Sequence, residues 1–508
     1  MLTRTALIAL CVAGSAFAQQ PLSAIEWLEN PPENLPGTVL LEPPITETGM
    51  HPRIEVAPLE ELSRPLGLVS SSVTGLPVDL WNGSDPDLIA ELITDIPVRG
   101  NPAMQRLLFT LLLSESRAPA GTGADETLLL ARLDRLMELG ATDPAQSLVQ
   151  VAGPTDTRAR FQRWFNATLL TGDEDRSCTS LIAQPYLSQD YSAQIFCKAR
   201  RGDWNSAALT LEVAHALQVM PIDKLNLLDR FLSPEFFEGA AYLPQPDNPD
   251  PLTFRLFETI GERLPTASLP RAFANADLRD VAGWKAQIEA AERLTRIGAL
   301  TPNQLLGLYT ERSPAASGGV WDRVAAVQRF DTALMSGNPK AIEKTLPSAW
   351  KAVQSVGLEV PFAELFSEDL SKVSLPNQNV EDLRWRILLL SENYESAALS
   401  IPSPTEENLF LSALAQGDPG RAQSPSPLAD AIAEGFAWSA PVPSDIKAML
   451  DNGQLGEAIL ESMQLFAYGA RGNLVDLTAA VAAFRKVGLE DTARRAALQL
   501  MILNGNGQ

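Results

Sequence analysis

The sequence predicts an all-α protein in which helical hairpins stack into a solenoid behind an extended, proline-rich N-terminal arm. The first observation is a recurring mark, a glycine followed five residues later by a small residue. The second is the spacing of Gly140, Gly172 and Gly202, which lie roughly 30 residues apart, near the length of one helix pair. The third is the lack of alternating strands and helices, which argues against the two α/β lobes common among exported solute receptors.

Residues 1–18 have the features of a secretory signal peptide. Arg4 supplies a positive charge, residues 6–12 form an apolar run, and residues 16–18 are small or apolar ahead of the cleavage point. The run is too short to span a bilayer, which takes about 20 apolar residues, and no later stretch is long enough. We therefore expect an exported, periplasmic protein without a transmembrane anchor. Lipidation at Cys11 is a less favoured alternative, because Leu10 stands where that signal needs a small residue.

Residues 19–83 form the predicted arm or linker. Its prolines exclude a regular helix or a central strand over most of this length. Two interpretations stay open: a disordered linker, or an arm that lies along the solenoid. The second is suggested by apolar residues that a solvated linker seldom carries. These are Val39, Leu40, Leu41, Ile54, Val56, Leu66, Leu68 and Val69.

Residues 84–243 form the predicted N-terminal helical-repeat block. It begins at Ser84-Asp85-Pro86, a helix start with proline in the first turn. The clearest hairpin runs from residue 193 to 217, where Gly202 separates two helices. Gly202 can adopt the positive φ of a helix C-cap, and a residue as small as Ala207 lets two backbones approach closely. The same mark recurs at Gly140/Ala145, Gly172/Ser177, Gly417/Ala422, Gly453/Ala458 and Gly488/Ala493.

The hairpin at Gly202-Asp203-Trp204, with Ala207, Leu211 and Ala214, resembles the second-helix pattern of tetratricopeptide repeats. The preceding helix lacks that family's aromatic and leucine-glycine positions. The resemblance implies a stack of antiparallel helix pairs. In layout the chain is also similar to exported helical-repeat proteins of alphaproteobacteria that are uncharacterised, and to accessory proteins of the flagellar stator in that group.

The rest of the chain divides at proline-rich stretches. Residues 244–270 are predicted to be a crossing loop, residues 271–370 a middle helical block, and residues 371–503 a C-terminal helical-repeat block with a frayed tail at 504–508. The mark at Gly417/Ala422 is a poor copy, because Pro425 and Pro427 would stop its second helix early.

The charge balance restricts the kind of partner. The chain has 62 acidic and 40 basic residues, a net charge of −22. No cluster of lysine and arginine could neutralise a phosphate backbone, so nucleic acid is not an expected partner. The net negative charge has two interpretations. It either keeps the surface solvated, or it forms an acidic face that binds a basic partner.

Two cysteines, Cys178 and Cys197, remain after removal of the leader, and they are predicted to form a disulfide. They fall in consecutive hairpins, which a solenoid places side by side. Closing this loop of about 20 residues would stabilise the fold by on the order of 3 kcal/mol. The alternative is a pair of reduced, buried thiols.

The sequence indicates no catalytic, cofactor-binding or metal-binding residue. Only two histidines occur, His51 and His215, and neither has a partner at metal-ligand spacing. There is no nucleophile elbow and no phosphate-binding glycine loop. Glu115-Ser116 matches the catalytic dipeptide of lytic transglycosylases, but the Gly-Leu-Met-Gln stretch of those enzymes does not follow. Peptidoglycan cleavage is therefore a minor alternative.

One corner combines the residue types of interface hot spots with a glycine-rich loop at 315–319. Its candidate protein-binding residues are Tyr309, Glu311, Arg312, Trp321 and Arg323. The favoured alternative is a structural corner, in which Trp321 packs inward and Arg312 and Arg323 pair with Glu311 and Asp322. We expect a periplasmic, non-catalytic scaffold or adaptor that binds another envelope protein or a cell-wall-associated component. The alternatives are a flagellar-stator accessory and a lytic transglycosylase.

Overall fold

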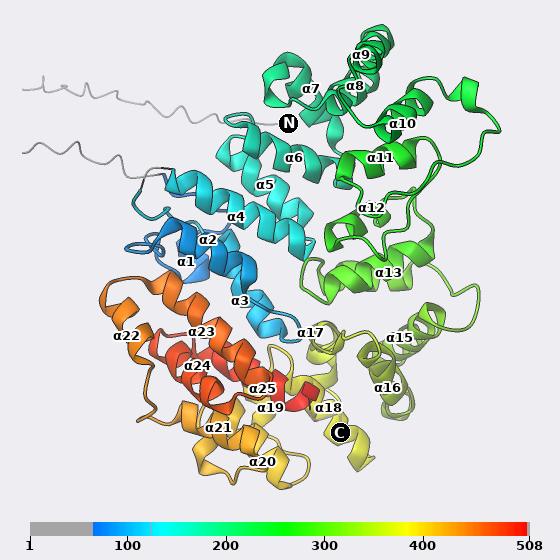
Figure 1. The fold of residues 1–508 in the computed structure, drawn as a ribbon. Helices are drawn as coiled ribbons and strands as arrows, with labels where there is room; N and C mark the ends of the chain where they lie inside the picture. The colour runs from blue at the N-terminus through cyan, green and yellow to red at the C-terminus, as the bar shows by residue number, and fades with distance from the viewer. Residues whose placement is uncertain (1–63, 122, 505–508) are drawn as a thin grey trace, which may run out of the picture. The chain divides into compact units, whose positions relative to one another are not determined.

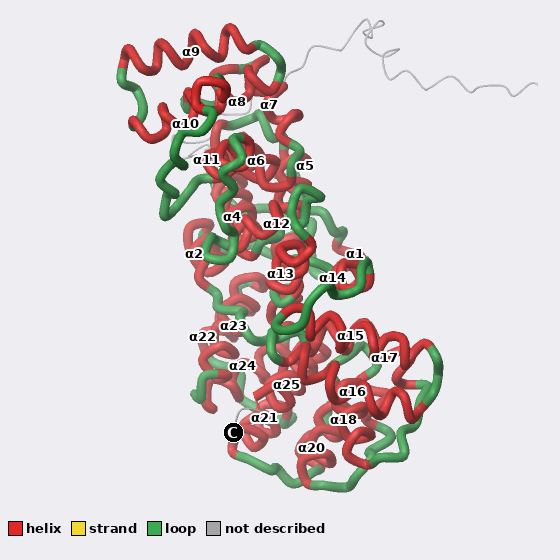
Figure 2. The backbone as a smooth tube through the Cα atoms, turned by 90° about the vertical axis from the view of Figure 1, so that its right-hand side faces the viewer, coloured by secondary structure: helices red, strands yellow, loops and turns green. Residues whose placement is uncertain are grey.

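The computed structural model describes residues 64–121 and 123–504, which belong to one compact unit. These residues form 25 α-helices and four short 3-10 helices, and no strand occurs among them (Figures 1 and 2). The predicted all-α class is confirmed. The predicted signal peptide, the arm up to residue 63 and the tail after residue 504 lie outside the described residues.

The helices have the following bounds in chain order. The first group is α1 (Ser71–Thr74), α2 (Pro86–Asp95), α3 (Pro102–Leu113), α4 (Ala124–Leu139), α5 (Thr142–Ala152), α6 (Arg158–Thr171), α7 (Glu174–Ala183), η1 (Pro185–Leu187), α8 (Tyr191–Arg200), α9 (Trp204–Leu217), α10 (Ile222–Leu232) and η2 (Pro234–Phe237). The second group is α11 (Pro251–Thr259), η3 (Arg271–Phe273), α12 (Ala274–Asp277), α13 (Trp284–Thr295), α14 (Pro302–Thr310), α15 (Val320–Met335), α16 (Pro339–Gln354) and α17 (Glu359–Ser371). The third group is α18 (Gln378–Leu389), α19 (Tyr394–Ala398), α20 (Glu406–Ala415), η4 (Pro419–Arg421), α21 (Pro427–Phe436), α22 (Ser444–Asp451), α23 (Leu455–Ala470), α24 (Leu474–Lys486) and α25 (Glu490–Asn504).

The glycine marks lie at helix ends, as predicted. Gly202 follows α8 with a φ of 83°, a left-handed conformation that glycine adopts without strain. A Cβ on Gly202 would meet no atom within 4 Å, so this glycine is required for its backbone conformation and not for space. The close approach comes from the small residue after it. Ala207 is fully buried in α9 against α8.

Consecutive helices pair along the chain, as a stack of hairpins requires. The pairs with the most extensive contact include α5 with α6, α8 with α9, α15 with α16 and α23 with α24. The poor mark at Gly417 behaves as its prolines predict, because only the short η4 follows it and Ala422 lies in extended backbone. The fold is therefore repeat-like and compatible with a helical solenoid.

The two ends of the described chain also pack together, which exceeds the neighbour contacts of a simple solenoid. Helix α3 lies against α25, and α2 lies against α23 (Figure 1). The Asn101 side chain donates to the Ala496 carbonyl at 3.1 Å, and the Ala103 N–H donates to Gln499 Oε1 at 2.8 Å. One apolar core runs continuously from Leu76 to Ile502. The blocks separated at proline-rich stretches thus share a core.

The prediction of a loop over residues 244–270 was wrong in part, because α11 occupies Pro251–Thr259. Asp250 caps the helix, since its carboxylate accepts from the Thr253 N–H at 2.7 Å. Pro251 stands at the first helical position, where its missing N–H costs nothing. Pro251 therefore begins a helix instead of breaking one. Leu252 and Phe254 bury this helix against α6.

The last part of the predicted arm, residues 64–83, packs on the helical body. Its backbone pairs with the segment after α3, where the Leu66 N–H donates to the Ser116 carbonyl at 3.0 Å. Arg132, which is fully buried, donates to the carbonyls of Leu66, Leu112 and Ser114. Burial lowers the pKa of Arg132 to about 10. This guanidinium therefore fixes the docked segment to α4.

Candidate functional site

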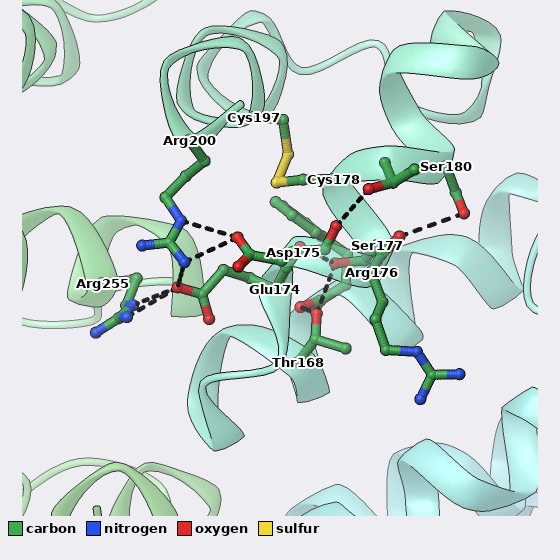
Figure 3. The surroundings of a disulfide bond; sticks show 12 residues. Thr168, Glu174, Asp175, Arg176, Ser177, Cys178, Ser180, Cys197, Arg200 and Arg255 are labelled. Carbon is green, nitrogen blue, oxygen red and sulfur yellow. Dashed lines mark hydrogen bonds and ion pairs between the residues drawn. A yellow bond between two sulfur atoms is a disulfide. The ribbon is translucent and has the colours of Figure 1, made fainter. Parts of the chain in front are cut away.

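The predicted cysteine pair is at disulfide distance. The sulfur atoms of Cys178 in α7 and Cys197 in α8 are 1.97 Å apart, and both side chains are fully buried (Figure 3). The consecutive hairpins lie side by side, as the predicted stacking requires. The bond ties α7 to α8, the helix that α9 and α10 both contact.

A buried ion cluster lies next to this disulfide. Glu174, at the start of α7, has no solvent exposure and accepts from Arg255 of α11 through Nε at 3.1 Å and Nη2 at 2.8 Å. Arg200 of α8 approaches the same oxygen at 3.4 Å (Figure 3). Arg255 also pairs with Glu258. The cluster joins the α7–α8 hairpin to a helix about 80 residues further along the chain.

The candidate binding corner at residues 309–323 combines an exposed loop with side chains that pack inward. Tyr309 is buried, and its hydroxyl donates to Glu292 Oε1 at 2.7 Å. Arg323 donates two hydrogen bonds, of 2.8 and 2.6 Å, to the same carboxylate. Burial, followed by the charge of Glu292, raises the pKa of Tyr309 well above its usual range. Glu292, in α13, is the partner that sequence reasoning missed, because it lies 31 residues from Arg323.

The remaining residues of the corner divide between core and surface. Trp321 is half-buried and packs on Trp284, with ring centroids 5.0 Å apart. Arg312 is exposed and pairs with its neighbour Glu311 at 2.8 Å. Asp322 accepts from the Gly318 N–H, so it shapes the loop instead of pairing with Arg323. Of the five candidate residues, Glu311 and Arg312 are the exposed ones, and the docking role of this corner stays a prediction.

We expect Trp321→Ala to lower the free energy of unfolding by about 2 kcal/mol, since a half-buried indole loses its contact with Trp284. Arg312→Ala is the matched surface control and should change stability by about 0.5 kcal/mol or less. Urea denaturation followed by tryptophan fluorescence measures both. Unchanged stability in the Trp321 variant would return this residue to the candidate interface.

The strongest candidate for a docking surface lies on α9. Leu209, Val213 and Leu217 follow one another at four-residue spacing and are 62%, 42% and 65% exposed. The opposite face of the helix buries Ala207, Leu211 and Ala214. Helix α9 rests on α8 and α10 and is the outermost helix there (Figure 2). We call Leu209, Val213 and Leu217 the α9 surface.

This helix departs from the usual amphipathic pattern, in which the outward face is polar. The apolar strip also continues beyond α9, because Val219 and Ile222 in the turn to α10 are exposed. An exposed row of large aliphatic side chains is typical of a contact surface, whereas single exposed ones are ordinary.

The charged residues that α9 and the turn to α10 themselves contribute beside the α9 surface are acidic. Between Arg201 and Lys224 the sequence contains no lysine or arginine. Glu212 on α9 and Asp223 at the start of α10 are exposed. Lys198 of α8 donates to Thr210 Oγ1 on α9 at 2.7 Å, and His215 Nε2 lies 3.1 Å from Asp229. The surface is therefore apolar with an acidic border.

The dipeptide Glu115-Ser116 lies in the link after α3, where its backbone pairs with residues 66–69. Glu115 lines a cavity of about 380 Å³ together with Arg64, Arg132 and Arg160. A catalytic acid of the lytic transglycosylase type needs an apolar pocket, and this lining is charged.

Within residues 64–121 and 123–504, no group of three or more His, Cys, Asp or Glu side chains is placed to hold a metal ion. No helix in the same part of the chain has the length and apolar character needed to cross a membrane. Comparison with protein-family models, with curated proteins and with solved structures finds no match to this chain.

Proposed function

We propose that this protein is a non-catalytic, periplasmic adaptor that binds a basic amphipathic helix of another envelope protein on the α9 surface. The observation that carries the proposal is the exposed aliphatic row on a helix whose other face is already buried. A partner helix with apolar residues at three- and four-residue spacing would cover this row, as helices do in hydrophobic grooves.

The acidic border specifies the charge of the partner. Glu212 and Asp223 flank the apolar row, and neither forms an ion pair with a lysine or arginine of the described residues. Lysine and arginine beside the apolar face of a partner helix would complement this border and speed its association. Fully burying one leucine side chain stabilises a complex by about 1.5–3 kcal/mol, so the row itself supplies most of the affinity.

The cysteine pair supports the proposed periplasmic location. A disulfide between Cys178 and Cys197 forms and persists in oxidising compartments such as the periplasm. The features of residues 1–18 predict the same destination. The predictions of a flagellar-stator accessory and of a lytic transglycosylase gain no specific support from the described residues and stay predictions.

Binding of a synthetic peptide of leucine and lysine at helical spacing tests the proposal. Calorimetry should show saturable binding that weakens as salt rises. The Val213→Asp variant should weaken it about tenfold or more, which corresponds to about 1.4 kcal/mol. The matched control is Val475→Asp, because Val475 on α24 is 78% exposed and lies outside the α9 surface.

A second peptide, with glutamate in place of lysine, controls for the charge. It should bind far more weakly, since its charges repel Glu212 and Asp223. Equal binding of both peptides would contradict the acidic border. Equal binding by the two protein variants would contradict the α9 surface as the site.

A further inference from the structure

A cavity of about 530 Å³ lies where the beginning, middle and end of the described chain meet. Its walls come from the end of α2 through the start of α3, the end of α4, η3, Ile297 after α13, the end of α23, and Leu500 in α25. Helix α2 contacts both α4 and α23. The cavity is therefore built by the contacts that join the two ends of the chain, and it is separate from the α9 surface.

Arginines dominate the charged lining of this cavity, although acidic residues outnumber basic ones in the chain as a whole. The four are Arg99, Arg135, Arg271 and Arg471. The lining contains two carboxylates, Asp95 and Glu138, and Glu138 is already paired with Arg135.

Two of the arginines donate hydrogen bonds to carbonyl groups at helix ends. Arg135 is 6% exposed and donates to the carbonyls of Thr94 and Ile96 at the end of α2. Arg271 donates to the Glu138 carbonyl near the end of α4 at 3.3 Å. The carbonyls at a helix C-terminus have no partner within the helix, so these contacts explain the positions of both residues.

The other two arginines make no such contact with a helix end. Arg99 and Arg471 are exposed, and no carboxylate of the described residues lies within ion-pair distance of either. Burial lowers the pKa of Arg271, and the positive charges of Arg99 and Arg293 lower it further. Positive charges in the cavity thus act on one another without full compensation.

We propose that this cavity binds a small molecule that carries a carboxylate or phosphate group and an apolar portion. Guanidinium groups hold both kinds of anion with paired hydrogen bonds. Pro97 and Ala467, which are partly exposed, form an apolar wall of the same cavity. The volume lies within the range of small-molecule sites, which is about 300–1,000 Å³.

Calorimetric titration of the full-length exported protein with citrate, inorganic phosphate and phenyl phosphate tests the proposal. We expect saturable binding of at least one of them below about 10 mM. Citrate binding alone identifies a carboxylate ligand, and phosphate binding alone a phosphate ligand. Phenyl phosphate should bind more tightly than inorganic phosphate, because its ring contacts the apolar wall. The absence of saturable binding by all three would overturn the proposal.

Paired substitutions locate the site. Arg99→Gln combined with Arg471→Gln should weaken binding about 100-fold, since each lost charged hydrogen bond costs roughly tenfold or more. The control is Arg176→Gln combined with Arg421→Gln, which removes the same charge from two other exposed arginines. Thermal melting of both proteins checks that they fold. Equal affinity of the two double variants would place any anion binding elsewhere and refute the site.

Discussion

Replacing Arg255 by methionine should lower the free energy of unfolding by about 3–5 kcal/mol, the usual cost of breaking a buried ion pair. The substitution leaves Glu174 fully buried without its two hydrogen bonds from Arg255. Arg200 remains at 3.4 Å from the same oxygen, a distance at which it cannot replace them. Glu258 also loses one of its partners.

A double substitution separates the isolated charge from the loss of packing. Arg255→Met combined with Glu174→Met removes both the cation and the carboxylate that it leaves behind, so the double variant should be more stable than Arg255→Met alone. The surface control is Glu368→Ala, whose pairing with Lys372 is exposed and is worth about 1 kcal/mol or less. Urea denaturation measures all of them. A double variant less stable than the Arg255 variant would show that the buried charge is not the cause.

Loss of the Cys178–Cys197 disulfide should be the other large effect, about 3 kcal/mol. The bond closes a loop with a sequence separation of 19 residues and restricts the unfolded chain more than the folded one. Cys178→Ala combined with Cys197→Ala should lower the denaturation midpoint, and adding dithiothreitol to the wild type should have a similar effect. The variant itself should not respond to the reductant.

Thiol counting on the denatured, unreduced protein is the direct check on this bond. No reactive thiol is expected from the mature chain. Two reactive thiols would contradict the disulfide, and the stability difference would then have to come from packing of the buried side chains.

Local signals in the sequence were enough to predict the helical class and the hairpins. A glycine such as Gly202 needs a positive φ, and a small residue such as Ala207 is needed at a tight crossing, so the chain itself specifies each corner. The pairing of Cys178 with Cys197 followed because stacked hairpins bring neighbouring helices together.

Contacts between distant segments could not be predicted in this way. The contact of α3 with α25 depends on Asn101 and Gln499, polar residues whose spacing carries no local pattern. Arg323 likewise had an acidic neighbour in Asp322, yet the structure pairs it with Glu292 of another helix. The arginine-lined cavity belongs to the same class, because its walls come from six separate parts of the chain.

The α9 surface could be predicted from the sequence only in part. The sequence predicted that Ala207, Leu211 and Ala214 share a buried face, and they do. It could not show that the face carrying Leu209 has no cover, because a further repeat could have packed there. The absence of lysine and arginine between residues 201 and 224 was the available signal.

Site-specific photo-crosslinking in the intact envelope tests the central claim most directly. A photoreactive amino acid at position 209 should capture one protein partner, and the crosslinked peptide should be an amphipathic helix with lysine or arginine beside its apolar face. The same group at position 475, also exposed but outside the α9 surface, should not capture it. Capture of the same partner from both positions, or attachment to a segment without a basic amphipathic pattern, would contradict the account.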